Sequence, residues 1–278
     1  MNLRAPFQIA ARAAVAATAF ACLLTAAHAD ELVAPYVNTV EEDVELILDL
    51  AGVGPGDYVI DLGAGDGRFV VSAAKRGALG HGVELDPALV DLARRRAAEA
   101  GVAHRAAFRV GDIFEASIKE ATVITLYLMP EANLKLRPKL LAELRPGTRV
   151  VSNSFHMGDW QPDGHVQGRT SGGAMLWIIP AQVAGEWLVD VVGERLHLSL
   201  TQRYQEVAAT LSSAEQQFSI SSINLTGNVL TLTAESGARR LSLHGRMEGQ
   251  TASGTAHVAN RTSTQITSWN AHRRVPGG

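Results

Sequence analysis

The sequence predicts an α/β fold with a doubly wound parallel sheet, followed by a small all-β antiparallel barrel or sandwich. From about Tyr58 to Phe155, short apolar segments alternate with segments of helical periodicity, which is typical of parallel strands covered by helices. A turn rich in glycine joins the first apolar segment to the first helical one. Beyond about Ala181, polar and apolar residues alternate between frequent turn residues, which indicates short antiparallel strands.

The first elements follow from capping and turn residues. Thr39, with Glu42 three residues later, forms a capping-box pattern that predicts a helix with Thr39 as its N-cap. Gly52 ends this helix, and residues 54–57 form a turn into the first strand. The helix after the glycine-rich turn is predicted over residues 68–76.

The later elements alternate in the same way. Asp86 and Pro87 form an N-cap and first-turn pair for a helix that runs to about Ala100. A nearly continuous apolar run is typical of a central strand covered on both faces. In chain order we expect strands over 81–86, around 108–110 and over 122–128 (the apolar run), a helix with Pro138 near its start, and strands over 148–155 and 174–179.

Polar residues follow four of the predicted strands at their carboxyl ends. These residues are Asp61, Glu84, Asp112 and Tyr127. The carboxyl ends of parallel strands meet at one edge of the sheet, where ligands bind. Residues 63–67 carry almost no side-chain bulk, so their backbone N–H groups can approach a ligand closely. An acid at the end of the second strand lies where a ribose presents its hydroxyls, so the pattern predicts a nucleoside site.

The spacing in the glycine-rich turn argues against a dinucleotide. Gly63 and Gly65 match the first two positions of the dinucleotide pattern, but Arg68 occupies the third, where a small residue is needed. Asp66 adds a negative charge that we expect to repel a pyrophosphate and to accept a cationic or zwitterionic ligand. A nicotinamide oxidoreductase is therefore disfavoured.

The pattern Asp61-x-Gly63-x-Gly65-x-Gly67 followed by Glu84 resembles the first two motifs of class I S-adenosylmethionine (SAM) methyltransferases. The resemblance implies a Rossmann-like sheet in which the loop holds the methionyl part of SAM and Glu84 binds the ribose. It also implies that Asp112 bonds the adenine amino group, beside the backbone N–H of Ile113. The residues expected at SAM are Tyr36, Asp61, Gly63, Ala64, Gly65, Asp66, Gly67, Glu84, Leu85, Asp112, Ile113 and Tyr127.

A narrower resemblance covers roughly residues 34–180. The phrases APYVNT, DLGAGDGR and GVELDP, with the segment that starts at Thr125, are similar to lysine methyltransferases of the c-subunit of mitochondrial ATP synthase and to their uncharacterised bacterial relatives. This resemblance implies a protein acceptor, with lysine as the methylated side chain. The alternative is an exported, non-catalytic binding protein that retains a nucleoside pocket and uses the β domain to bind its ligand.

The end of the fourth strand bears on the acceptor. Many amine and nucleobase methyltransferases carry an Asn/Asp-Pro-Pro-Tyr/Phe motif there, whereas this chain has Leu128 and Met129 in place of the polar residues. The chain therefore lacks the carbonyl pair that would hold a planar nucleobase amine. Tyr127 or Glu131 is a candidate to orient an acceptor, and the simpler interpretation of Tyr127 is a pocket wall.

The net charge of the chain and the spacing of its histidines bear on whether it binds nucleic acid or a metal ion. A formal net charge of -3 over 278 residues lacks the basic bias of nucleic-acid-binding proteins, so no nucleic-acid partner is expected. His156, Asp159 and His165 lie close in sequence but fit no zinc pattern, so no metal is expected. They are better explained as part of a loop that lines the acceptor pocket.

The N-terminal segment predicts export. Residues 1–29 resemble a signal peptide, with Arg4 and Arg12 before a run of apolar and small residues from Ala13 to Ala27, and Ala27-His28-Ala29 as the cleavage pattern. The chain would then be periplasmic or secreted, in a compartment that must receive SAM from the cytosol. An uncleaved anchor that keeps the domain near a membrane and a misassigned start codon remain alternatives. The single cysteine, Cys22, lies in this segment.

The expected domains are therefore a signal peptide over residues 1–29, a methyltransferase domain over 30–180 and a β-rich domain over 181–278. In the β-rich domain, glycines mark the predicted turns. These predicted turns include Gly193, Gly227, Gly237, Gly245, Gly249 and Gly254.

Overall fold

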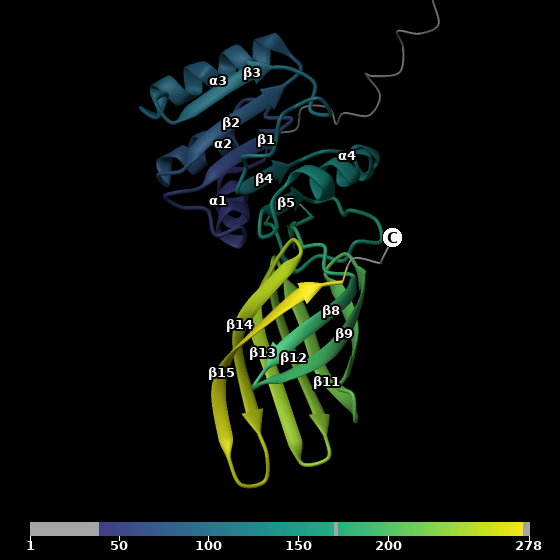
Figure 1. Ribbon diagram of the computed structural model, residues 1–278. Helices are drawn as coiled ribbons and strands as arrows, with labels where there is room; N and C mark the ends of the chain where they lie inside the picture. The colour runs from purple at the N-terminus through teal and green to yellow at the C-terminus, as the bar shows by residue number, and fades with distance from the viewer. Residues whose placement is uncertain (1–38, 170–171, 275–278) are drawn as a thin grey trace, which may run out of the picture.

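A computed structural model describes residues 39–169 and 172–274, and it confirms the predicted fold class (Figure 1). A seven-stranded sheet covered by helices is followed by a closed antiparallel barrel of eight strands. The predicted signal peptide lies outside the described residues. No helix among the described residues has the length and apolar character needed to cross a membrane.

The sheet has the order β3-β2-β1-β4-β5-β7-β6. Its first five strands are parallel, while β7 is antiparallel to β5 and β6 is antiparallel to β7. The strand order reverses between β1 and β4, which is the point where open α/β sheets bind ligands. The elements are α1 (Glu41–Leu50), β1 (Tyr58–Leu62), α2 (Arg68–Lys75), β2 (Leu79–Glu84), α3 (Pro87–Glu99), β3 (Ala106–Val110), β4 (Val123–Leu126), α4 (Pro130–Glu143), β5 (Arg149–Asn153), β6 (Gly164–Val166) and β7 (Ala174–Ile178).

Alternate residues of the central strands feed two hydrophobic cores. Val59, Val123 and Val151 pack on one face with α1 and α2. Ile60 and Ile124 point to the other face, where α4 and residues 113–121 cover them. Burial on both faces explains why β4 has no polar alternation in its sequence.

Three details differ from the sequence expectations. Helix α1 has Val40 as its N-cap and no side-chain capping bond, so the predicted capping box at Thr39 is wrong. The Thr39 hydroxyl instead accepts a hydrogen bond from Asn153 at 3.2 Å, because the end of β5 lies beside it. Helix α4 begins at Pro130 and contains Pro138 in its interior, and the short strand β6 was not predicted.

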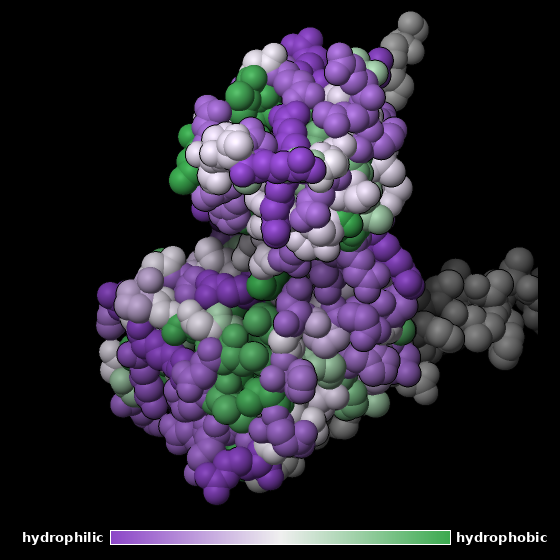
Figure 2. Space-filling view, turned by 90° about the horizontal axis from the view of Figure 1, so that it is seen from below, coloured by the Kyte–Doolittle hydropathy of each residue, from purple (hydrophilic) through white to green (hydrophobic). Residues whose placement is uncertain are grey.

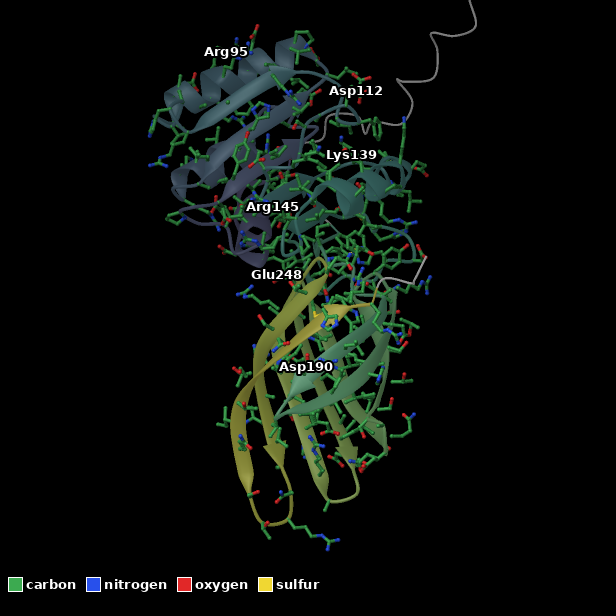
Figure 3. All side chains as sticks on the ribbon, viewed as in Figure 1. Arg95, Asp112, Lys139, Arg145, Asp190 and Glu248 are labelled. Atoms are coloured by element: carbon green, nitrogen blue, oxygen red, sulfur yellow. The ribbon has the colours of Figure 1, made fainter. Side chains whose placement is uncertain are left out.

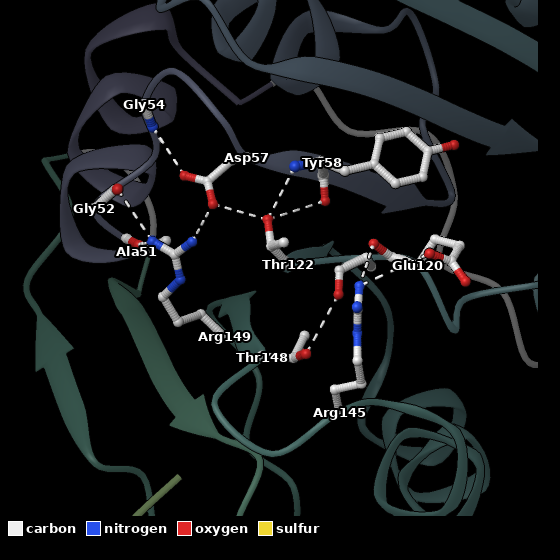
Figure 4. Close-up of polar contacts among 11 residues, drawn as sticks. Ala51, Gly52, Gly54, Asp57, Tyr58, Glu120, Thr122, Arg145, Thr148 and Arg149 are labelled. Atoms are coloured by element: carbon white, nitrogen blue, oxygen red, sulfur yellow. Dashed lines mark hydrogen bonds and ion pairs between the residues drawn. The ribbon is translucent and has the colours of Figure 1, made fainter. Parts of the chain in front are cut away.

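A polar network at the edge of the sheet fixes the starts of β1, β4 and β5 (Figure 4). Asp57 accepts hydrogen bonds from Thr122 at 2.8 Å and from the backbone of Gly54 at 3.0 Å, and it pairs with Arg149. Arg149 also donates to the carbonyl of Ala51 at 2.7 Å, just beyond α1. One carboxylate therefore sets the relative position of three strands and a helix end.

The barrel is an up-and-down meander that closes between β15 and β8. Its lumen is filled by apolar side chains, including Trp187 and Trp269. The strands are β8 (Gly185–Val191), β9 (Glu194–Arg203), β10 (Glu206–Ser212), β11 (Gln217–Thr226), β12 (Val229–Ser236), β13 (Arg239–Glu248), β14 (Thr251–Ala259) and β15 (Thr264–Arg273).

Two glycines predicted as turns lie inside strands. Gly245 of β13 pairs with Gly254 of β14, so the predicted turns at these positions are wrong. A Cβ on Gly245 would lie 2.5 Å from the Trp269 ring and 2.3 Å from the carbonyl oxygen of Ser253. The glycines are therefore needed because Trp269 packs directly on the backbone there, which is a known use of glycine in strands.

The end of the barrel remote from the sheet is closed by an ion pair. Glu194 at the start of β9 pairs with Arg239 at the start of β13 at 2.5 Å. These strands lie on opposite sides of the barrel order, so the pair spans the lumen. Arg239 also lies over the ring of Phe218, at 5.6 Å from its centroid.

The sheet and the barrel meet at a narrow junction. The backbone N–H of Ala181 donates to the carbonyl of Gly227 at 2.8 Å. A Cβ on Gly227 would lie 3.0 Å from the Cα of Gly147, so the two backbones are in direct contact. Figure 2 shows two lobes separated by a constriction, with hydrophilic residues over most of this face and hydrophobic residues gathered beside the constriction.

We expect Gly245→Ala to destabilise the barrel by roughly 1–3 kcal/mol, because the added methyl group has to displace Trp269 or strand backbone. Urea denaturation followed by tryptophan fluorescence measures this loss. Gly54→Ala is the control, since a Cβ there meets no atom within 4 Å. Equal stability of both variants would contradict the packing described for Trp269.

Candidate active site

A cavity of about 470 Å³ opens at the carboxyl edge of β1, β2 and β4. Its position is the strand-order reversal, and its size is within the usual range for small-molecule sites. Its walls combine the glycine-rich turn, the end of β2 and the ends of β4 and β5. The lining residues are Thr39, Asp61, Gly63, Ala64, Gly65, Asp66, Arg68, Phe69, Glu84, Leu85, Asp86, Leu89, Tyr127, Leu128, Met129 and Phe155.

The glycine-rich turn has the left-handed backbone that its sequence predicts. Gly63, Gly65 and Gly67 have φ values of 85°, 51° and 79°. A Cβ on Gly63 would also lie 2.9 Å from Leu128. Gly67 lies outside the cavity lining, where a Cβ would lie 2.7 Å from Phe108, so it allows α2 to pack closely.

Glu84 holds this turn as well as lining the cavity. Its Oε2 accepts a hydrogen bond from the backbone N–H of Gly65 at 2.8 Å. Its Oε1 accepts from the N–H groups of Leu85 at 2.8 Å and Asp86 at 3.1 Å. A carboxylate has about four lone-pair sites, and these three hydrogen bonds leave about one of them for a hydroxyl group of a ligand.

Asp66 differs from the sequence expectation of a charge directed at the ligand. It is 2% exposed and forms ion pairs with Arg68, at 2.6 Å, and with Arg96. Two guanidinium groups therefore compensate its charge, as a buried carboxylate requires. Asp66 consequently repels a pyrophosphate less than its sequence position predicts, because Arg68 of α2 and Arg96 of α3 compensate its charge.

Burial strongly perturbs the carboxylate of Asp61. It is 3% exposed, and Thr125 donates a hydrogen bond to it at 2.7 Å. Burial raises the pKa of Asp61 to about 7, the Thr125 bond opposes this shift, and the charges of Glu84 and Asp66 add to it. This end of the cavity therefore favours a cationic ligand, which would stabilise the ionised form of Asp61.

The end of the cavity that lies at β4 and β5 is apolar and aromatic. The rings of Tyr127 and Phe155 are stacked, with centroids 6.2 Å apart and planes at 25°. Leu128 is buried and Met129 is 38% exposed at the rim. The residues that replace the polar acceptor motif thus form a hydrophobic wall.

Other predicted site residues lie elsewhere. Glu131 is exposed in the first turn of α4 and is absent from the cavity lining. Asp112 lies just beyond β3 and is exposed (Figure 3), and its Oδ1 accepts from the backbone N–H of Phe114 at 2.8 Å. Ile113 is buried in the core below it. Tyr36 lies outside the described residues.

Several lining residues were not predicted as site residues. Leu89 lies in the first turn of α3, and Asp86 is the N-cap of that helix, as predicted. Arg68 and Phe69 come from the start of α2. Their one sequence signal is position: the first turn of a helix that follows a β-strand at the ligand-binding edge faces the ligand.

The loop after β5 holds no gathering of metal ligands. Across residues 39–169 and 172–274, no three His, Cys, Asp or Glu side chains come together as a metal site. His156 accepts a hydrogen bond from the backbone N–H of Gly158 at 3.0 Å. Asp159 forms ion pairs with Arg137 and Arg203, at 2.5 and 2.7 Å.

Comparison with known proteins agrees with this geometry. Residues 61–164 match the ANTKMT methyltransferase domain. A protein-lysine N-methyltransferase of Saccharolobus islandicus is 43% identical over 46% of this chain and 81% of its own length. A Xenopus laevis lysine N-methyltransferase of the ATP synthase c-subunit is 36% identical over 50% of this chain, which spans 60% of that protein.

One solved structure extends the comparison to the cofactor. The chain is similar to a Salinibacter ruber protein described as an RNA methyltransferase, crystallised with S-adenosyl-L-homocysteine. The two are 50% identical, with a TM-score of 0.51, over 53% of this chain and 96% of that one. The matches confirm that SAM is the cofactor, and that the protein is a SAM-dependent methyltransferase. The chain belongs to the class I SAM-dependent methyltransferases, in the subgroup that contains these protein-lysine methyltransferases.

Proposed function

We propose that this enzyme transfers the methyl group of SAM to the side-chain amine of a lysine in a protein. The observation that carries the proposal is the polarity of the cavity. Carboxylates of β1 and β2 line one end, and the stacked pair Tyr127 and Phe155, just beyond β4 and β5, lines the other. The first end suits a cationic nucleoside, and the second suits an uncharged amine.

The carboxylate end fits the cofactor. We assign a ribose hydroxyl to the remaining lone pair of Glu84 and the methionyl ammonium group to the neighbourhood of Asp61. The left-handed backbone at Gly63 and Gly65 lets the loop lie close to this part of the ligand. The cofactor supplies an electrophilic methyl group on a sulfonium centre.

The apolar end of the cavity favours the neutral form of the acceptor amine. A lysine attacks a methyl carbon only as the neutral amine, so it must lose a proton before transfer. Burial between Tyr127, Leu128 and Phe155 disfavours the charged form of an entering lysine and so lowers its pKa. The protein then has to align the nitrogen with the methyl group, which accounts for much of the rate gain in such reactions.

The relatives support a protein acceptor. The proteins from Saccharolobus islandicus, Xenopus laevis and Mus musculus are described as lysine methyltransferases, the last of adenine nucleotide translocase. Nothing in the comparisons supports the alternative of a non-catalytic binding protein. The Salinibacter ruber protein, however, is described as an RNA methyltransferase, so RNA is the competing acceptor for the test.

Transfer of a labelled methyl group tests the proposal. The enzyme is incubated with methyl-labelled SAM and a bacterial extract that contains both protein and RNA. We expect the label in material that protease digests, and as methylated lysine after acid hydrolysis. Label released by ribonuclease instead would assign RNA as the acceptor and reject the protein proposal.

We also propose that the chain is exported, from the signal-like pattern of residues 1–29. Export would restrict the acceptor to proteins outside the cytosol or at a membrane. Mass spectrometry of the N-terminus of the cellular protein tests this idea. A mature chain that begins at Asp30 supports cleavage, and an intact segment in a soluble cytosolic fraction rejects export.

Glu84→Ala is expected to weaken SAM binding by about tenfold or more, because hydrogen bonds to a charged acceptor contribute roughly 1.5–3 kcal/mol. The variant also releases the N–H of Gly65, which disturbs the loop. Isothermal titration calorimetry measures the affinity. Asp91→Ala is the control, since Asp91 is exposed on α3 and pairs with Arg94. Unchanged affinity in folded Glu84→Ala would remove Glu84 from the site.

Asp61→Asn is expected to stabilise the ligand-free protein while it weakens SAM binding. The folded-state pKa of Asp61 is about 7 and its ordinary value is 3.8, so the folded protein disfavours ionisation. The resulting loss of stability develops as the pH rises from about 4 to 7 and is complete above 7. Asparagine removes this penalty, so we expect a gain of at least about 1 kcal/mol at pH 8, or about 2–4 °C in Tm.

Thermal denaturation of wild type and Asp61→Asn at pH 5 and pH 8 checks this sign. The gain should be larger at pH 8 than at pH 5. For the wild type, SAM affinity should fall below about pH 7, since the ionised carboxylate is the form that pairs with a cation. A stability gain that is the same at both pH values would show that Asp61 does not titrate in this range.

A further inference from the structure

The segment of residues 154–160 connects the cavity to the barrel. It begins directly after β5, and Phe155 forms the aromatic wall with Tyr127. Two residues later Met157 is fully buried in the core under α4. The segment ends at Trp160, which is also fully buried and packs against Trp177 of β7, with ring centroids 6.1 Å apart.

The turn between β9 and β10 of the barrel contacts the end of this segment. The ring of Tyr204 stacks on Trp160, with centroids 5.5 Å apart and planes at 20°. Gln205 accepts a hydrogen bond from the indole N–H of Trp160 at 2.7 Å and donates one to the carbonyl of Gln161 at 2.7 Å. One two-residue turn therefore contacts Trp160 on its face and at its edge.

Asp159 joins the two lobes beside this contact. Its carboxylate pairs with Arg137 of α4 at 2.5 Å and with Arg203 of β9 at 2.7 Å. The hydroxyl of Tyr204 donates to the same carboxylate at 3.2 Å. The hydrogen bonds from Arg203 and Arg137 lower the pKa of Asp159 to about 2, so it is ionised at any working pH.

The backbone of Tyr204 carries a cost that these contacts offset. Its φ is 55°, in the left-handed region where a bulky side chain is strained and glycine is usual. Strain of this kind persists where the surroundings determine the conformation and often marks functional positions. A glycine would adopt this backbone conformation without strain, but it would have no ring to stack on Trp160.

We propose that Tyr204 is a positioning residue, through which the barrel fixes segment 154–160 and so the aromatic wall that receives the acceptor. The inference rests on the proposed function, because it assigns Phe155 to the acceptor side of the cavity. The barrel thereby acts on the acceptor and leaves the carboxylates that hold the cofactor unchanged. The β9–β10 turn acts through segment 154–160, because no described residue of the barrel lines the cavity itself.

Tyr204→Gly tests the proposal in the full chain with S-adenosylhomocysteine bound. Hydrogen–deuterium exchange of the peptide that spans residues 154–161 should rise about tenfold, since a stacked aromatic pair and its hydrogen bond are lost. The affinity for S-adenosylhomocysteine should stay within about twofold, because the carboxylate end is untouched. Tyr204→Phe should restore slow exchange, since it keeps the stacked ring.

Val192→Gly is the matched control. Val192 has a φ of 51° in the turn between β8 and β9, at the opposite end of β9, and is 47% exposed. Relief of the same backbone strain there should leave exchange over 154–161 unchanged. Unchanged exchange in Tyr204→Gly, or an equal rise in Val192→Gly, would overturn the proposal.

A kinetic measurement separates this inference from the proposed function. Poly-L-lysine serves as the probe acceptor with labelled SAM. If wild type methylates it, Tyr204→Gly should raise the KM for poly-L-lysine about tenfold with the KM for SAM unchanged. If wild type transfers no methyl group to any protein, the proposed function fails, while the exchange result still decides whether the turn positions the segment.

Discussion

The site depends on the hydrogen bonds that the Glu84 carboxylate accepts from the backbone of two turns. Glu84 ends β2 and accepts backbone N–H groups from Gly65 in the first βα turn and from Leu85 and Asp86 in the second. Two turns that are separated in sequence are thereby held at one edge of the sheet. Because the bonds run to backbone atoms, they fix the loop without side chains that would fill the cavity. The same oxygens then face the place where the ribose is expected.

The fold was predictable because the strands of the sheet and the barrel carry different periodicities. Buried β4 is apolar except at Thr125, whereas barrel strands such as β9 alternate between polar and apolar residues. The pattern in each strand therefore indicates whether one face or both faces are buried. Prediction failed where tertiary contact overrides local preference. Thr39 and Glu42 match the capping-box pattern, yet the Thr39 hydroxyl accepts a hydrogen bond from Asn153 and does not cap the helix. Glycines such as Gly245 and Gly254 are typical of turns. Their place inside strands is explained only by the packing of Trp269 against the backbone.

The site was predictable to the extent that strand ends define it. Asp61, Glu84 and Tyr127 line the cavity because β1, β2 and β4 end together. The pairing of Asp66 with Arg96 could not be foreseen, since Arg96 comes from the far end of α3 and meets Asp66 only in the folded chain. The role of the barrel turn was equally hidden. Nothing local to Tyr204 indicates that its ring lies on Trp160, more than forty residues earlier in the chain.

The direct contact between Gly147 and Gly227 has a consequence for the shape of the acceptor. Residues 179–184 form the whole connection between β7 and β8, and Ala181 within it is bonded to Gly227. A connection this short, bonded at Ala181 and packed against the backbone of Gly147, restricts the rotation of one lobe relative to the other. Under the proposed function, a protein that contacts the barrel would have to present its lysine within a narrow range of distance and angle from that contact. Selectivity would then depend more on where the lysine lies on the surface of that protein than on the residues that flank it.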